Sequence, residues 1–145
     1  MPERKSETIL KAFYAALQGA LPAGATHARN GSLPAKIPAA GHAVLRDGDP
    51  GDPEVTLSPL AYHYEHRAEV EVLIELPPAT REEAFDAMVR AVGAVILVDR
   101  TLGGLCDWIE GEAPAPLSIA IEGAEGWKAA TITVLLHYTS SDPLV

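Results

Sequence analysis

Residues 62–76 read YHYEHRAEVEVLIEL, and this stretch is the clearest strand pattern of the chain. Its even-numbered positions are mostly aromatic or aliphatic: Tyr62, Tyr64, His66, Ala68, Val70, Val72, Ile74 and Leu76. Its odd-numbered positions are mostly charged: His63, Glu65, Arg67, Glu69, Glu71, Leu73 and Glu75. Successive side chains of a strand point to opposite faces of a sheet, so the alternation predicts one long strand with one face on the core and the other in water.

The segment from Ser6 to Leu21 has the periodicity of an amphipathic helix. Its apolar side chains recur at helical spacing and form one stripe: Ile9, Leu10, Phe13, Leu17 and Leu21. Ser6 is expected to cap the helix, and Pro22 with Gly24 to end it.

A second helix is predicted after the long strand, which Pro77 and Pro78 end. Thr80-Arg81-Glu82-Glu83 has the form of a capping box, with two acids at the positive end of the helix. The apolar stripe of this helix consists of Phe85, Met88, Val89, Val92 and Ile96. Gly103-Gly104 is expected to close the element or to start a short helical turn through Trp108.

Four further strands are expected, at residues 25–30, 42–46, 117–122 and 128–139, with a hairpin turn at 123–126. The order α-β-β-β-α-β-β predicts an α+β fold: a mostly antiparallel sheet of four to five strands with both helices on one face. The expected common core is Phe13, Leu17, Val70, Val72, Ile74, Phe85, Met88, Val92, Ile132 and Val134. A length of 145 residues fits a single domain, 1–145.

The composition disfavours several partners. Twenty acidic against eleven basic residues give a formal net charge of −9, which repels nucleic acid and anionic membrane surfaces. A lone cysteine excludes an intrachain disulfide. The N-terminus lacks the apolar core of a secretory signal, and the most apolar stretch, 91–98, is too short to span a bilayer. A cytoplasmic protein is expected.

No motif predicts a catalytic, cofactor or metal site. His63 and His66 should point to opposite faces of their strand, and His27, His42 and His137 are isolated in sequence. The acids of the loop 47–54, Asp47, Asp49, Asp52 and Glu54, are better explained by an exposed, mobile turn than by a calcium loop, although weak calcium binding stays open.

The remaining candidate groups also have a simpler structural reading. Cys106 has no neighbouring base and reads as a small buried apolar residue. Glu69, Glu71 and Glu75 share a strand face beside Arg67, which favours a solvated or partner-facing surface over a catalytic carboxylate pair.

The chain resembles the tail-terminator proteins (minor tail protein U-like) of long-tailed bacteriophages and prophage-derived particles. The resembling parts are RAEVEVLIELP (67–77), the helix opened by Thr80, DRTLGGL (99–105), Gly126-Trp127 and the strand 130–138. The Pro-rich segment 33–41 departs from the pattern.

The resemblance implies a structural protein and not an enzyme. Such proteins form a six-membered ring on the end of the tail tube, stop its polymerisation and present a surface to the head connector. The implied partners are therefore further copies of the chain, the tube protein and a head connector protein, within a phage or phage-like particle. Two alternatives remain: a head–tail joining or tail-completion protein, and a small-ligand-binding protein or enzyme of unknown activity.

A ring needs a heterologous interface, in which one patch meets a different patch on the next copy. The charged face of the long strand is one candidate patch, and Arg29, Lys36 and Arg46 are candidates for a basic partner patch.

Overall fold

The structure, a computed structural model, describes residues 3–117 and 126–145. Its elements in chain order are α1 (Lys5–Ala20), β1 (Thr26–Arg29), β2 (His42–Asp49), β3 (Glu54–Leu57), β4 (Leu60–Glu75), α2 (Pro78–Val98), β5 (Trp108–Gly111), β6 (Ala115–Pro116) and β7 (Trp127–Ser140). The fold is α+β, as predicted, with two helices and one mixed sheet within the described ranges.

The sheet is organised around β4 and β7, which pair antiparallel from Tyr62↔Ser140 to Glu75↔Trp127. The strand order is β1-β2-β4-β7-β5, with β3 on β4 and β6 on β7. Because β7 occupies one edge of β4, β2 and β3 share the other edge, separated by residues 50–53. In the same way β5 and β6 share the outer edge of β7. These two interrupted edges explain why the sheet has seven strands in the part of the chain that the structure describes, where four to five were predicted.

One pairing departs from the antiparallel pattern. β1 runs parallel to β2, with Thr26 opposite His42. A parallel neighbour needs a long crossover, and residues 30–41, which include the Pro-rich segment, provide it without a helix.

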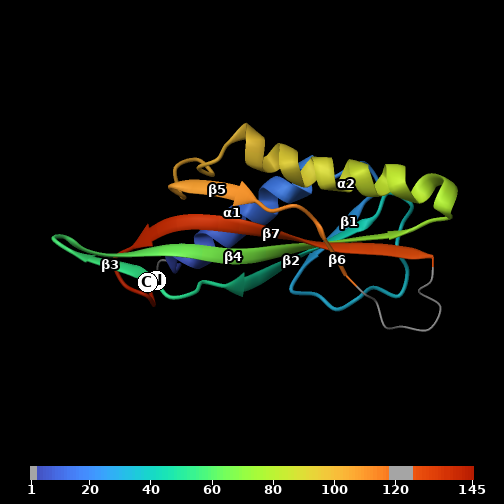
Figure 1. Cartoon of the computed structure of the whole chain (residues 1–145). Coiled ribbons are helices and arrows are strands. Elements are labelled where there is room, and N and C mark those ends of the chain that lie inside the picture. Colours follow the sequence, from blue (N-terminus) through green and yellow to red (C-terminus); the bar gives the residue numbers. More distant parts are fainter. Residues whose placement is uncertain (1–2, 118–125) are drawn as a thin grey trace.

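Both helices cover the same face of the sheet, as predicted (Figure 1). The even-numbered residues of β4 point to this face, and Val70, Val72 and Ile74 have no exposed surface. All ten predicted core residues belong to this cluster, with Phe85 only partly buried at its rim. The register inferred from the alternation 62–76 is therefore confirmed.

The opposite face has a smaller core that the sequence did not predict. Ile37, Val44, Leu73 and Ala129 are buried together, and Leu33 and Trp127 pack against them. The alternation predicts Leu73 on the water-facing side, and this prediction is wrong because the Pro-rich segment, with Leu33 and Ile37, packs against the sheet there. One end of the sheet is thus buried on both faces.

Both predicted helix caps are wrong. α1 begins one residue before Ser6, with Arg4 as N-cap and no side-chain cap. α2 begins at Pro78 because proline is pre-organised for the first helical turn and needs no hydrogen-bond partner for its nitrogen. Thr80 consequently lies inside the first turn, and its Oγ1 contacts the carbonyl oxygen of Pro77 at 3.5 Å.

Other boundaries also differ. β2 extends through Asp49 and β3 begins at Glu54, so the predicted loop 47–54 shrinks to residues 50–53. The strand predicted at 117–122 and the turn at 123–126 lie outside the described residues except at their end positions. There the backbone nitrogen of Leu117 donates to the carbonyl oxygen of Ala129 at 3.0 Å. Instead of a helical turn through Trp108, a turn leads into β5.

Candidate functional site

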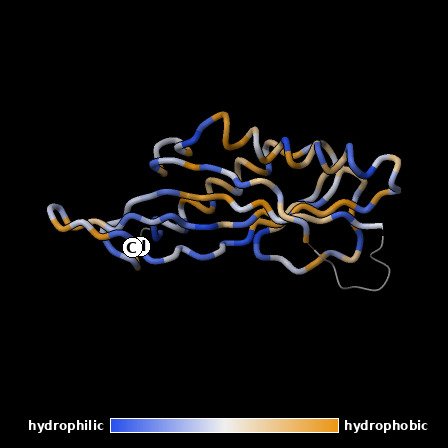
Figure 2. Tube along the Cα trace, viewed as in Figure 1, coloured by the Kyte–Doolittle hydropathy of each residue, from blue (hydrophilic) through white to orange (hydrophobic). Residues whose placement is uncertain are grey.

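A hairpin extends beyond the helices at one end of the sheet (Figure 1). We call residues 54–63, from β3 and the start of β4, the arm. Val55 lies opposite Tyr62, and Leu57 lies opposite Leu60. Directly opposed residues share a face, so these four side chains lie on the face that α1 and α2 cover elsewhere. The described residues do not cover them fully: Val55, Leu57 and Leu60 are 45%, 79% and 50% exposed. Figure 2 shows apolar residues near this tip.

The other face of the arm is polar and tightly connected. The His63 ring bonds Thr56 Oγ1 through Nε2 and Thr139 Oγ1 through Nδ1, both at 3.0 Å. These bonds tie β3 to β4 and β4 to β7. From position 47 to 66 the chain has no Lys or Arg, and its five acids are Asp47, Asp49, Asp52, Glu54 and Glu65. The arm is therefore an ordered amphipathic hairpin in an acidic segment.

A second uncovered apolar surface lies between α2 and the edge formed by β5 and β6. It is a groove of about 250 Å³, lined in part by Val89, Gly93, Leu97, Gly111 and Pro114. Leu97 is 71% exposed. A side chain at position 93 would have no atom within 4 Å of its Cβ, so the absence of one at Gly93 leaves the groove open. We call this surface the α2 groove.

Arg100 stands at the rim of the α2 groove. Its Nη1 donates to the carbonyl oxygen of Ile109 at 3.0 Å, and its guanidinium lies 4.7 Å from the centre of the Trp108 ring. Arg100 forms no ion pair with a carboxylate anywhere in residues 3–117 or 126–145. The groove thus combines apolar side chains with two charged ones: Arg100, which has no ion pair among the described residues, and Glu112, which is paired with Arg67.

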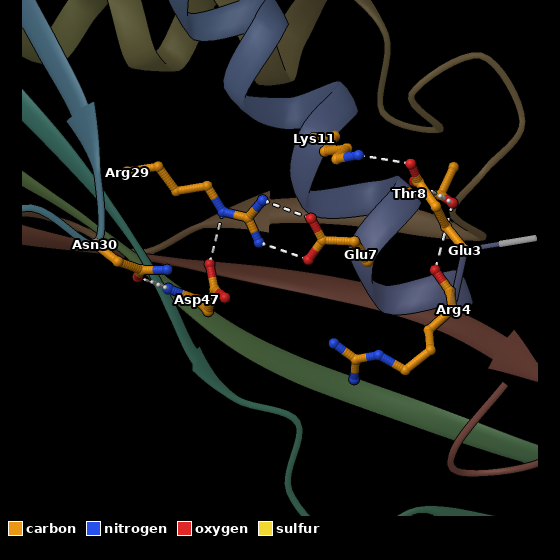
Figure 3. Close-up of polar contacts among 8 residues, drawn as sticks. All are labelled: Glu3, Arg4, Glu7, Thr8, Lys11, Arg29, Asn30 and Asp47. Atoms are coloured by element: carbon orange, nitrogen blue, oxygen red, sulfur yellow. Dashed lines mark hydrogen bonds and ion pairs between the residues drawn. The ribbon is translucent and has the colours of Figure 1, made fainter.

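The cluster around Arg29 is structural (Figure 3). Arg29 donates two hydrogen bonds to Glu7 and one to Asp47, each at 2.9 Å. The hydrogen bonds from Arg29 hold the pKa of Glu7 below its usual value. Partial burial raises the pKa of Asp47, but its bonds to Arg29 and Asn30 outweigh that effect and lower it. These contacts join α1 to β1 and β2.

Two of the three cations predicted to form a basic patch for a neighbouring copy are already paired with acids of their own chain. Arg29 is held by Glu7 and Asp47, and Arg46 Nε donates to Glu71 at 2.8 Å. Among the described ranges 3–117 and 126–145, Lys36 alone of the three has no such pair, and it is exposed on the Pro-rich segment. Glu71 is also removed from the predicted charged strand surface, which keeps Glu65, Arg67, Glu69 and Glu75 exposed.

His66 lines a small cavity of about 180 Å³ together with Tyr138 and Ser140. Its Nε2 lies 2.6 Å from the carbonyl oxygen of Asp47, which can only accept, so Nε2 carries the proton. Nδ1 then accepts from the hydroxyl of Tyr138 at 2.9 Å. Burial raises the pKa of Tyr138 to about 12. Nε2 thus joins β4 to β2 and Nδ1 joins β4 to β7, so neither ring nitrogen is positioned to serve as a base.

The other predicted residues do not converge. His63 is exposed and His66 buried, on opposite faces as expected. His27 bonds Tyr14, His42 bonds Thr26, and His137 lies half-buried on β7. In the acidic segment, Asp49 accepts from the backbone nitrogen of Gly51 at 2.8 Å. Within the described part of the chain, no three His, Cys, Asp or Glu side chains are grouped so that they could hold a metal ion.

Cys106 is buried, with 4% of its surface exposed. Burial raises the pKa of its thiol to about 12, so the reactive thiolate is not populated near neutral pH. Its position agrees with the expectation of a small buried apolar residue.

No family model matches the chain, and no curated protein matches it. Neither helix of the described residues combines the length and apolar character needed to cross a bilayer.

Sequence reasoning missed both uncovered apolar surfaces. The arm had a detectable signal, because Val55, Leu57 and Leu60 flank Ser58-Pro59 and resemble two short strands around a turn. The α2 groove had none, since it forms where residues 111–114, which connect β5 to β6, lie beside α2.

Proposed function

We propose that the protein is a structural component that caps a phage-type tail tube as a ring, ends its polymerisation and forms the surface for head attachment. One observation carries the proposal: a single chain presents two different uncovered apolar surfaces, the arm and the α2 groove. Two distinct patches on identical subunits fit a heterologous interface, which closes into a ring when the rotation between copies is right. The family likeness of the sequence supports the same role.

The charge of the chain is consistent with such a ring. DNA has to pass through the opening of a tail, and a formal net charge of −9 reduces its adhesion to the wall. In this role the protein is cytoplasmic during assembly and then part of the particle, and its partners are further copies of itself, the tube protein and a head connector protein.

A head–tail joining or tail-completion protein would use the same kind of interface. The partner separates the two roles: a terminator binds the end of the tube, whereas a joining protein binds the portal side of the head. The alternative from another class, a small-ligand-binding protein or enzyme, would use the cavity beside His66. That role is less well supported, because the ring nitrogens of His66 are already bonded within the chain.

The test is a tail-assembly reaction with and without this protein, viewed by electron microscopy. With the protein present, tubes of uniform length should end in a ring and join heads. Without it, tubes should grow past their normal length and fail to join. Tubes of normal length that still join heads in its absence would rule out the terminator role.

A further inference from the structure

We infer that the arm of one copy docks in the α2 groove of the next copy, so that Val55, Leu57 and Leu60 cover Gly93 and Leu97. This inference rests on the proposed function, because it names the contact between neighbouring subunits of the ring. It assigns a binding role to two surfaces that the monomer leaves uncovered.

The arm requires an apolar partner on one face. In the body of the sheet, this same face is covered by the two helices, and Val70 and Val72 are completely buried. Along the arm the face continues past the end of the helices, so that Leu57 is 79% exposed. Uncovered apolar patches on an ordered element are typical of interaction sites. The natural complement is another helix surface.

The α2 groove offers that surface. The C-terminal half of α2, from position 91 to 98, consists only of apolar residues and Gly93, so it has no polar face to solvate. Leu97 and Val98 are 71% and 84% exposed. Gly93 lines the same groove as Leu97, and a Cβ atom at position 93 would meet no atom within 4 Å, so the surface is open at this point.

Charge favours a second copy as the occupant. The segment 47–66 is acidic without a single Lys or Arg, and Glu54 is exposed at the base of the arm. Arg100 at the groove rim has a carbonyl and an aromatic ring as partners but no carboxylate among the described residues. Glu112, which also lines the groove, is paired with Arg67. An incoming arm belongs to a segment with five acids and no Lys or Arg, so it brings negative charge toward Arg100.

The contact has to be intermolecular. The arm is part of the continuous strand β4 and points away from the helices (Figure 1). Hydrogen bonds through His63 hold it in that direction. Each copy thus presents one arm and one groove, which gives matched numbers of both surfaces in any closed assembly.

Cross-linking tests the contact directly. Two full-length variants, Leu57→Cys and Gly93→Cys, carry different tags and are mixed under mild oxidation. The native thiol of Cys106 is buried and should not form a disulfide. The mixture should give a covalent pair containing both tags. Leu144→Cys replaces Leu57→Cys as the matched control, because Leu144 is 78% exposed and Leu57 is 79% exposed, and this control should give no pair with Gly93→Cys. Equal cross-linking in the control, or none with Leu57→Cys, overturns the inference.

A second variant fills the groove without disturbing the fold. Gly93→Glu places a charged side chain in open space and improves helix propensity, so the monomer should stay folded. Gly19→Glu is the matched control, because Gly19 lies in α1 and also has open space around its Cβ position. Self-association, measured by sedimentation, should weaken roughly tenfold or more for Gly93→Glu because a charge enters an apolar contact. Gly19→Glu should associate like the unaltered protein.

The two proposals fail in different ways. If Gly93→Glu still forms rings that cap tails, the docking contact is wrong and the terminator role stands. If Leu57→Cys and Gly93→Cys cross-link arm to groove but tails assemble normally without the chain, the terminator role is wrong and the contact stands. If Leu57→Asp abolishes capping while Gly93→Glu does not, the arm binds the tube and not a second copy, and the inference is overturned.

Discussion

Gly48 lies so close to Arg67 that a Cβ atom at position 48 would stand 1.9 Å from the carbonyl oxygen of Arg67. Gly48 has a φ of +73° and lies in a β-bulge. Between the pairs Arg46↔Glu69 and Asp49↔Arg67, β2 has two residues where β4 has one. Only glycine combines that dihedral with that approach. The bulge sets the direction in which the chain continues toward the arm.

Gly48→Ala should therefore lower the free energy of unfolding by more than about 3 kcal/mol, since the clash is with backbone and cannot be relieved by a rotamer change. Gly51→Ala is the control. Gly51 also has a positive φ of +70°, but its nearest neighbour would be 3.9 Å away, so only the dihedral cost of about 1–2 kcal/mol should remain. Urea denaturation of both variants measures the difference, and equal losses would refute the steric argument.

Val72→Asp should cost about 3–5 kcal/mol or prevent folding, because Val72 is completely buried under the helices and the carboxylate would have no partner. Val55→Asp makes the same change on the same sheet face at a position that neither α1 nor α2 covers, where Val55 is 45% exposed. It should cost less than about 1 kcal/mol in the isolated protein. Thermal unfolding followed by circular dichroism gives both values.

The Arg29 cluster predicts a specific acid sensitivity. Glu7 and Asp47 have folded-state pKa values below their usual ones, so their contribution to stability is present above the unfolded-state pKa and is lost as the pH falls through the folded-state pKa. Arg29→Met should cost about 1–2 kcal/mol at neutral pH, since its carboxylate partners are partly exposed.

The pH profile separates this cluster from ordinary surface charge. Between about pH 5 and pH 3 the unaltered protein should lose more stability than Arg29→Met. Protonation of Glu7 and Asp47 weakens their ion pairs with Arg29, and the variant lacks these ion pairs at every pH. Lys11→Met is the control, since Lys11 pairs with Glu3 on the exposed side of α1 and its removal should leave the profile nearly unchanged. Parallel profiles for Arg29→Met and the unaltered protein would contradict the assignment.

The Cys106 thiol should not react with a thiol reagent at about pH 8 in the native protein, because burial raises its pKa to about 12. Full reaction is expected once denaturant unfolds the chain. Measured rates should therefore follow global unfolding, and rapid labelling without denaturant would show that the site opens locally.

Prediction from the sequence was reliable where one hydrophobic periodicity continued over several helical turns or several alternating strand positions. The alternation through Val70 and Val72 predicted the register of the central strand, and the stripe through Phe13 and Leu17 predicted the buried face of the first helix. Both signals reflect a single physical cause, the burial of one face, which local sequence records directly.

Prediction failed where structure depends on distant partners. Leu73 is buried only because the segment around Ile37 crosses the sheet, and nothing near either residue in sequence indicates that contact. The ion pairs of Arg29 have the same origin, since Glu7 lies 22 positions away. The candidate docking surfaces were missed for this reason as well: an apolar side chain is recorded in the sequence, but whether another element covers it is not.

The unbroken course of β4 from Leu60 to Glu75 also has a mechanical consequence. A load applied at the tip of the arm pulls along β4, and the hydrogen bonds that join it to β7 lie across the strand direction. Such a load shears the whole ladder from Tyr62 to Glu75 at once and does not peel its bonds one after another. A subunit held by its arm would therefore resist tension with the full length of its central strand pair.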